Sequence, residues 1–220
     1  MIQLPDFSRT WDFENNFFLS CDKTRMSKIL AQYDLFKMAF DVPGCIVECG
    51  VFKGTSLSRF AMLRDLFGGD ESRKIIGFDT FEKFPDTKFE DDKGMLEKFC
   101  AEAGNESISV EQMRDVLNHK KSNNNIDLIA GDINETIPEY VKKNPALRIS
   151  LLNLDTDIYE PAVTILEHLY PRIVPGGILV LDDYEIFSGE TKAVDDYFKG
   201  KNIKIQRLSY ARTPVYVVKK

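Results

Sequence analysis

The feature that most constrains the fold is a series of short, nearly uninterrupted apolar runs that each end at an acidic residue. Between these runs lie longer segments whose apolar residues recur at helical spacing. Continuous apolar strands are typical of a parallel sheet that helices cover on both faces. The sequence therefore predicts an α/β sandwich with a largely parallel central sheet. Strands are expected at residues 45–47, 74–79, 127–132, 149–154 and 178–181.

The carboxyl end of the chain departs from this alternation. Two β segments, at residues 203–208 and 215–218, have no helical segment between them. Strands joined by a short turn pair antiparallel, so we expect an antiparallel hairpin at one edge of the sheet. Helices are expected at residues 22–40, 55–67, 95–103, 110–117, 137–143, 160–170 and 191–198.

The 220 residues are expected to form one domain with two additions to the sandwich. Residues 1–43 form an amino-terminal helical segment, and the aromatic residues among the first 20 positions are expected to dock over the core. Residues 82–125 are polar and rich in charge, with few apolar anchors. Such a segment has low local stability, so we expect it to act as a mobile lid.

Charge and composition limit the classes of partner. The formal net charge is −6, and proteins that bind nucleic acid usually present a basic face, so nucleic acid is not expected as a partner. The four cysteines form no C-x-x-C pair, which indicates free thiols in a reducing compartment. We find neither a secretory signal nor an apolar run near the roughly 20 residues that span a bilayer. The expectation is a cytoplasmic protein that does not bind a membrane.

The stretch CIVECGVFKGTSLS, residues 45–58, predicts a ligand site. It reads as a strand, an acidic residue at position 48, a loop with Gly50 and Gly54, and the start of a helix. A strand, a glycine loop and a helix start form a cradle for a ligand that carries negative charge or hydroxyl groups. The loop lacks the G-x-G-x-x-G pattern of dinucleotide sites. This counts against a nicotinamide-dependent oxidoreductase, which remains an alternative.

Acidic residues gather where the predicted strands end. The carboxyl ends of parallel strands meet at one edge of a sheet, which is where ligands bind in open α/β folds. Asp79 lies about one strand–helix–strand unit after Glu48, and its carboxylate could accept both hydroxyl groups of a ribose. The alternative is that each acid merely caps the following helix. The acids at strand ends are Glu48, Asp79, Asp132, Asp155, Asp182 and Asp183.

A second group of acids surrounds two of these strand ends. If strands 149–154 and 178–181 are neighbours, the carboxylates of Asp155, Asp157, Asp182 and Asp183 converge. Like charges at that separation are unfavourable unless one group is protonated or a cation lies between them. Oxygen ligands suit Mg²⁺ or Ca²⁺ better than zinc, and the chain has only two histidines.

Together these residues resemble a known family. Five segments are similar to the TylF/MycF group of macrocin-type sugar O-methyltransferases, which have the Rossmann-like class I S-adenosylmethionine-dependent fold. These segments are VECGVFKGTS, IIGFDTF, GDINETIP, LLNLDTDIYEPAVTILEHLYPRIVPGGILVLDDY and AVDDYF. The resemblance covers about residues 44–198. It implies a seven-stranded sheet, S-adenosylmethionine as cofactor and a divalent metal, usually Mg²⁺.

The resemblance also implies roles for individual residues. The cofactor contacts would come from Glu48, Gly50 and Gly54 along its methionine part, from Asp79 at its ribose, from Asp132 near its adenine, and from Ser56 and Asp155. The metal ligands would be Asp155, Asp182 and Asp183, with Asp157 as the general base.

The resulting hypothesis is a metal-dependent transfer of a methyl group to a hydroxyl of a sugar or a similar small-molecule or glycan acceptor. A non-catalytic relative that binds a glycan is a further alternative, and a homo-oligomeric state is left open. The substrate-binding elements would lie in residues 82–125 and in the short amino terminus, where the sequence does not match the family closely enough to name the acceptor.

Overall fold

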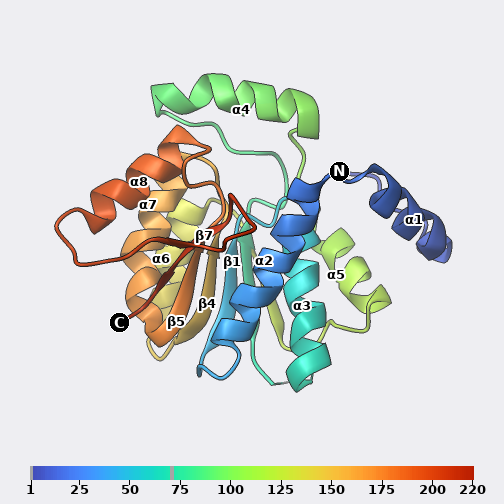
Figure 1. Ribbon diagram of the computed structural model, residues 1–220, viewed down its shortest axis with the longest axis horizontal. Helices are drawn as coiled ribbons and strands as arrows, with labels where there is room; N and C mark the ends of the chain where they lie inside the picture. The colour runs from blue at the N-terminus through green and yellow to red at the C-terminus, as the bar shows by residue number, and fades with distance from the viewer. Residues whose placement is uncertain (1, 70–71) are drawn as a thin grey trace.

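Across residues 2–69 and 72–220, which the computed structural model describes, a seven-stranded sheet forms the middle layer of the protein (Figure 1). The strand order is β3-β2-β1-β4-β5-β7-β6. The first five strands are parallel, whereas β7 runs antiparallel to β5 and β6 antiparallel to β7. The predicted α/β sandwich and the antiparallel edge are confirmed. The strands are β1 (Cys45–Cys49), β2 (Ile75–Asp79), β3 (Ile126–Ala130), β4 (Ile149–Leu154), β5 (Ile173–Leu181), β6 (Gln206–Arg207) and β7 (Val215–Val218).

The central strands are buried along their whole length, as their continuous apolar sequences require. Every residue of β1, β2 and β4 is buried. Because β4 pairs with β5 in parallel and Leu154 lies opposite Leu181, the two strands end side by side. This confirms that the predicted strands at 149–154 and 178–181 are neighbours. The strand β5 begins at Ile173, five residues before the expected start, with an irregular register against β4.

Helices cover both faces of the sheet (Figure 1). One face carries α2 (Lys23–Ala39), α3 (Thr55–Gly68) and α5 (Val110–His119), which build an apolar core around Phe36 and Phe60. The other face carries α6 (Ile133–Lys143), α7 (Tyr159–His168) and α8 (Ser188–Phe198), with a second core around Ile165 and Val194. Short 3₁₀ turns occur at Phe7–Arg9 and Tyr170–Arg172. No described helix combines the length and the apolar content needed to cross a bilayer.

The segment expected to be a lid divides into two parts. The helix α4 (Glu90–Ala103) lies across one end of the sheet, at the top of Figure 1, and is the part that covers the site. The helix α5 instead packs against α3, and its Met113 and Leu117 belong to the core. The expected low local stability therefore stays a prediction for the segment that contains α4, and it does not hold for α5.

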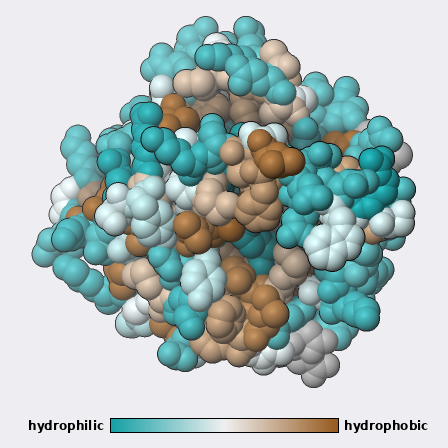
Figure 2. All heavy atoms as spheres, turned by 45° about the vertical axis from the view of Figure 1, so that its right-hand side comes forward, coloured by the Kyte–Doolittle hydropathy of each residue, from teal (hydrophilic) through white to brown (hydrophobic). Residues whose placement is uncertain are grey.

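The amino-terminal helix α1 (Thr10–Ser20) has no buried residue and projects from the body of the protein (Figure 1). The expectation that the first 20 residues dock over the core is therefore wrong for α1, whereas Ile2 and Leu4 pack against the core and the Phe7 ring stacks on that of His119. The aromatic residues of α1 do not recur at the spacing of one helix face, so this helix has no apolar stripe to bury. They are Trp11, Phe13, Phe17 and Phe18. With this side of the molecule turned forward, Figure 2 shows apolar patches among polar ones. The large apolar side chains that are exposed include Trp11, Leu19, Leu30 and Leu66.

Candidate active site

A cavity of about 640 Å³ opens where the parallel strands end. Its wall combines the loop after β1, the end of β2, the acids that follow β4 and β5, and residues of α4. Two basic side chains from α2, Arg25 and Lys28, also line it. Since ligands of open α/β sheets bind outside the carboxyl ends of the strands, this cavity is the candidate site.

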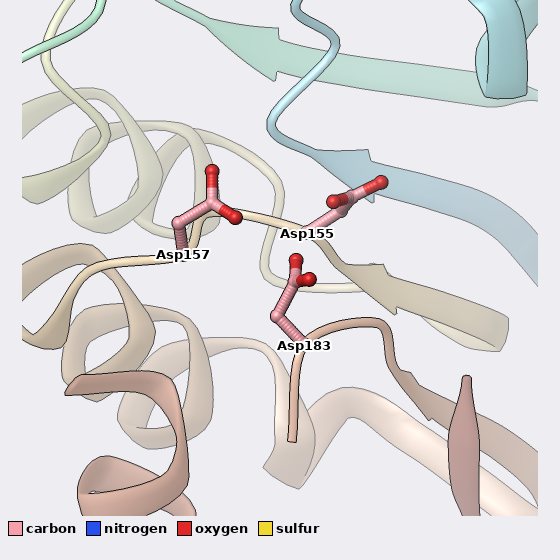
Figure 3. Close-up of side chains that lie close together, drawn as sticks. All are labelled: Asp155, Asp157 and Asp183. Carbon is pink, nitrogen blue, oxygen red and sulfur yellow. The ribbon is translucent and has the colours of Figure 1, made fainter. Parts of the chain in front are cut away.

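Three carboxylates meet on one side of the cavity (Figure 3). Asp155 and Asp157 follow β4, and Asp183 follows β5, so the pairing of these two strands brings them together. Each of the three offers an oxygen, and these oxygens all lie within 4.8 Å of one another. We refer to Asp155, Asp157 and Asp183 as the acid cluster.

A buried glutamate holds the two loops of the acid cluster together. Glu190, in the first turn of α8, accepts a hydrogen bond from the backbone N–H of Asp183 at 3.1 Å. Its own backbone N–H donates to the carbonyl oxygen of Asp157 at 3.2 Å. Glu190 is fully buried. The sequence analysis missed it, because nothing in the run SGETKAVDDYF separates it from an ordinary surface acid at a helix start.

Burial makes the charged forms of these acids unfavourable. It is the main cause that raises the pKa of Asp157 to about 8, and the charge of Asp155 adds to it. Burial also raises the pKa of Asp183, whose carboxyl group is hydrogen-bonded to that of Asp157. Ionising both acids together is therefore unfavourable without a cation.

Asp182 lies beside the acid cluster but takes a different partner. Its Oδ2 forms an ion pair with the ammonium group of Lys28, and the same group lies 3.8 Å from Oδ2 of Asp155. The structure thus gathers Asp155 and Asp183 of the expected metal ligands, together with Asp157, and pairs Asp182 with a lysine. Lys28 was not singled out from the sequence, because it lies 154 positions before its partner on a separate helix.

The donor set fits a hard divalent cation. All the groups are carboxylates, which are the ligands that Mg²⁺ and Ca²⁺ prefer. Two buried oxygens, Oδ1 of Asp182 and Oε2 of Glu190, have no hydrogen-bond partner among the described residues. Buried polar atoms are rarely left unpaired, so additional positive charge at this position would be stabilising.

The loop after β1 borders the same cavity next to the acid-bearing loop that follows β4. Gly50 and Ser56 line the cavity, whereas Glu48 is fully buried beneath it and accepts a hydrogen bond from the Ser56 hydroxyl. Burial raises the pKa of Glu48 to about 8. Gly54 precedes α3 with a φ of 78°, a conformation that glycine adopts without strain. Neither Glu48 nor Gly54 is among the described residues that line the cavity.

Gly50 lets this loop touch the acid-bearing loop directly. A Cβ atom at position 50 would lie 1.7 Å from the carbonyl oxygen of Asp155. The φ of Gly50 is also 91°, which disfavours other residues. Only glycine is therefore compatible with this approach of the two backbones.

The expected ribose-binding and adenine-binding acids both line the cavity. The two oxygens of Asp79 accept backbone N–H groups, from Phe52 at 2.9 Å and from Phe81 at 2.7 Å. Asp132 caps α6, accepting the N–H of Asn134 at 2.8 Å. The interpretation that the acid caps the following helix is thus correct for Asp132. Both Asp79 and Asp132 nevertheless line the cavity. A carboxylate has lone pairs left for a ligand after one or two such bonds.

Aromatic side chains that the sequence analysis did not single out form an apolar part of the wall. Phe99 of α4 has its ring centroid 5.6 Å from that of Phe52, 5.9 Å from that of Phe84 and 6.1 Å from that of Phe187. These four rings come from four separate segments, so no local pattern marks them. Flat apolar surfaces of this kind suit the faces of sugar or base rings.

The helix α4 is fastened over the cavity by Asp92, which is fully buried. Its carboxylate accepts the N–H of Tyr159 at 3.0 Å and the N–H of Gly189 at 2.7 Å. These donors lie in the first turns of α7 and α8, which have no side-chain cap of their own. Asp92 thus caps both helices that follow the acid-bearing loops.

The chain resembles known proteins in sequence and in fold. The chain matches the family model of macrocin-O-methyltransferase, TylF, over residues 20–217. A curated relative from Streptomyces olivaceus, named 8-demethyl-8-(2,3-dimethoxy-alpha-L-rhamnosyl)-tetracenomycin-C 4'-O-methyltransferase, is 32% identical over 165 residues, covering 73% of this chain and 60% of the relative. Another, demethyldecarbamoylnovobiocin O-methyltransferase from Streptomyces niveus, is 26% identical and covers 80% of this chain and 66% of the relative.

A solved structure of a calicheamicin methyltransferase has the same fold, with a TM-score of 0.79 and 28% identity, covering 96% of this chain and 88% of that chain. The chain thus spans nearly all of this solved structure, but only 60% and 66% of the lengths of the two curated relatives.

Proposed function

The chain belongs to the TylF family of macrocin O-methyltransferases, and we propose that it transfers a methyl group from S-adenosylmethionine to a sugar hydroxyl with the help of a divalent cation. The observation that carries the proposal is that the acid cluster and a glycine loop border one cavity. The relatives support the acceptor class, since the Streptomyces olivaceus protein is named for methylation of a rhamnosyl antibiotic.

The residues on the β1 side of the cavity suit the cofactor. Bound S-adenosylmethionine supplies an electrophilic methyl carbon on a positively charged sulfur. Gly50 and Ser56 would hold its methionine part, with Glu48 beneath them. Asp79 would accept hydrogen bonds from its ribose, and Asp132 would lie near its adenine.

The residues on the β4 and β5 side suit the metal and the acceptor. Asp155 and Asp183, with Asp182 beside them, would hold the cation. Such a cation, when bound, supplies positive charge that orients a hydroxyl group and lowers its pKa.

Asp157 is proposed as the general base. In the metal-free chain burial raises its pKa to about 8, and a bound cation would lower that pKa, so that the carboxylate is ionised and can accept a proton near neutral pH. It would take the hydroxyl proton while the bond between carbon and oxygen forms and the bond between carbon and sulfur breaks. Alignment of the acceptor oxygen with the methyl carbon is the main task left to the protein. The cover formed by α4 and Phe99 would support it by excluding water.

Family membership favours methyl transfer over the nicotinamide-dependent reaction, whose glycine pattern the loop lacks. The test is transfer of a labelled methyl group from S-adenosylmethionine to a panel of free, nucleotide-linked and antibiotic-linked sugars, with Mg²⁺ or with excess EDTA. We expect label in at least one sugar, lost on adding EDTA. Calorimetry should show binding of S-adenosylmethionine and not of NADH.

Each component of the proposal can fail separately in this test. Full transfer in excess EDTA would contradict the metal requirement alone. Cofactor binding without transfer to any sugar would favour the non-catalytic alternative. Binding of NADH in place of S-adenosylmethionine would contradict the proposal as a whole. A homo-oligomeric state remains a prediction, to be checked by sedimentation.

A further inference from the structure

Lys28 reaches the edge of the acid cluster from outside the sheet. It lies on α2, which packs on one face of the sheet, whereas the acids belong to loops at the strand ends. Its ammonium group forms an ion pair with Asp182 and lies 3.8 Å from Oδ2 of Asp155. Among the described residues, it is the only basic side chain within ion-pair distance of either acid.

The charge around Lys28 is strongly unbalanced. Four carboxylates lie near a single ammonium group, that of Lys28. They belong to Asp155, Asp157, Asp182 and Asp183. The ammonium group of Lys28 forms an ion pair with Asp182 and lies near Asp155, so its positive charge compensates part of this negative charge. An uncompensated group of buried carboxylates would be unfavourable, so this charge stabilises the metal-free site.

We propose that Lys28 is a tethered counter-ion that holds the place of a divalent cation at the Asp155–Asp182 edge, and that metal binding displaces its ammonium group into the cavity. The inference rests on the proposed metal-assisted function.

Two properties favour this displacement: the charge of the divalent cation and the flexibility of the Lys28 side chain. A divalent cation bound by Asp155 and its neighbours would compete with the ammonium group for the same carboxylates and repel it. The lysine side chain has a flexible four-carbon stem, and about a third of it is exposed in the structure. Because Lys28 lines the cavity, its ammonium group has space to move to and would then face the acceptor.

The test is the affinity for Mg²⁺ alone, measured by isothermal titration calorimetry on the whole chain without cofactor or acceptor. In the variant Lys28→Met the competing charge is absent, so we expect Mg²⁺ to bind at least about tenfold more tightly, a change of about 1.4 kcal/mol. The metal-free variant should also melt at a lower temperature than the wild type, and Mg²⁺ should raise its melting temperature more.

Two further variants separate charge from packing. Lys28→Arg keeps the charge and should bind Mg²⁺ nearly as weakly as the wild type. Arg25→Met removes a neighbouring basic residue that also lines the cavity but forms no ion pair with Asp155 or Asp182 among the described residues, and it should leave the affinity unchanged. If Lys28→Met fails to fold, Lys28→Gln is measured in its place.

Equal or weaker Mg²⁺ binding by Lys28→Met than by the wild type would overturn the inference, as would the absence of binding to either protein. Binding to Lys28→Met but not to the wild type would support it while contradicting metal assistance in the natural protein. These isotherms do not depend on turnover, so they are distinguishable from a failure of the methyl-transfer assay.

Discussion

Asp157 occupies a position where two roles must be told apart. It belongs to the acid cluster, yet the family resemblance makes it the base and not a metal ligand. Asp157→Asn keeps the shape of the side chain but removes the basic oxygen. We expect turnover to fall about 10²–10⁴-fold, as for the loss of a general base.

The affinity of the Asp157→Asn variant for Mg²⁺ decides between these roles. It should stay near that of the wild type, whereas Asp155→Asn should lose metal binding. A parallel loss of metal binding and turnover in Asp157→Asn would make Asp157 a ligand.

At the scale of single residues, the sequence predicted acids at strand ends but not the groups that hold them. The end of a buried apolar run fixes where Asp155 and Asp183 must lie, because parallel neighbours end at the same edge. Lys28 and Glu190 act through contacts between segments that lie far apart in the chain. A local pattern carries no information about such partners.

The connection between α4, α7 and α8 depends on one carboxylate. Asp92→Ala removes the acceptor for the N–H groups of Tyr159 and Gly189. Loss of one helix cap typically costs about 0.5–2 kcal/mol. We expect faster hydrogen exchange in α4 and in the first turns of α7 and α8, measured by mass spectrometry, and little change in the sheet.

The neighbouring residue supplies the control for this experiment. Asp91 lies on the same helix turn but is exposed, so Asp91→Ala should leave the exchange pattern unchanged. Unaltered exchange in Asp92→Ala would show that the aromatic contacts of Phe99 suffice to hold α4 in place.

At the scale of elements, most strand starts were predicted to within one residue, whereas β5, α4 and α6 begin four or five residues before their expected starts. The helix α6 begins at Ile133, four residues before the expected start, because Asp132 caps it there. Proline is unfavourable inside helices, and Pro138, in the second turn of α6, removes one backbone N–H from the hydrogen-bond pattern of this helix. Likewise α4 starts at Glu90 and not at position 95, since its acidic first turn has no apolar spacing.

The stability of the whole molecule should depend on pH through Glu48. Its pKa is about 8 in the folded chain against an ordinary 4.5, so the folded state binds this proton more tightly than the unfolded state. The contribution of Glu48 to the free energy of unfolding is then fully present below about pH 4.5 and decreases as the pH rises toward 8. Glu48→Gln cannot titrate and should lose this decrease.

Chemical denaturation in EDTA at several pH values measures the effect. A difference of one pKa unit between the two states corresponds to about 1.4 kcal/mol, so the Gln variant should be more stable than the wild type near pH 8 by a few kcal/mol. The exposed Glu139→Gln should show no such gain. Parallel pH curves for Glu48→Gln and the wild type would contradict a buried, protonated Glu48.

At the scale of the whole molecule, the sheet and its functional edge followed from the sequence because periodicity and chain topology determine both. The sandwich, the antiparallel edge and the pairing of β4 with β5 were all predicted. The amino-terminal segment was not, because the path of α1 away from the body and the reach of α2 into the cavity depend on packing that no periodicity describes.

The backbone contact at Gly50 also bears on how a protein of this shape could change its acceptor. Since the loop after β1 touches the carbonyl of Asp155, a mutation that shifts either loop disturbs the proposed cofactor and metal subsites together. The helices α2 and α4 close the cavity from outside the sheet, and apart from Lys28 their cavity-lining residues form no ion pair with the acids of these subsites among the described residues. Directed evolution toward a new acceptor would best confine its libraries to such positions, including Arg25, Phe99 and Ala103.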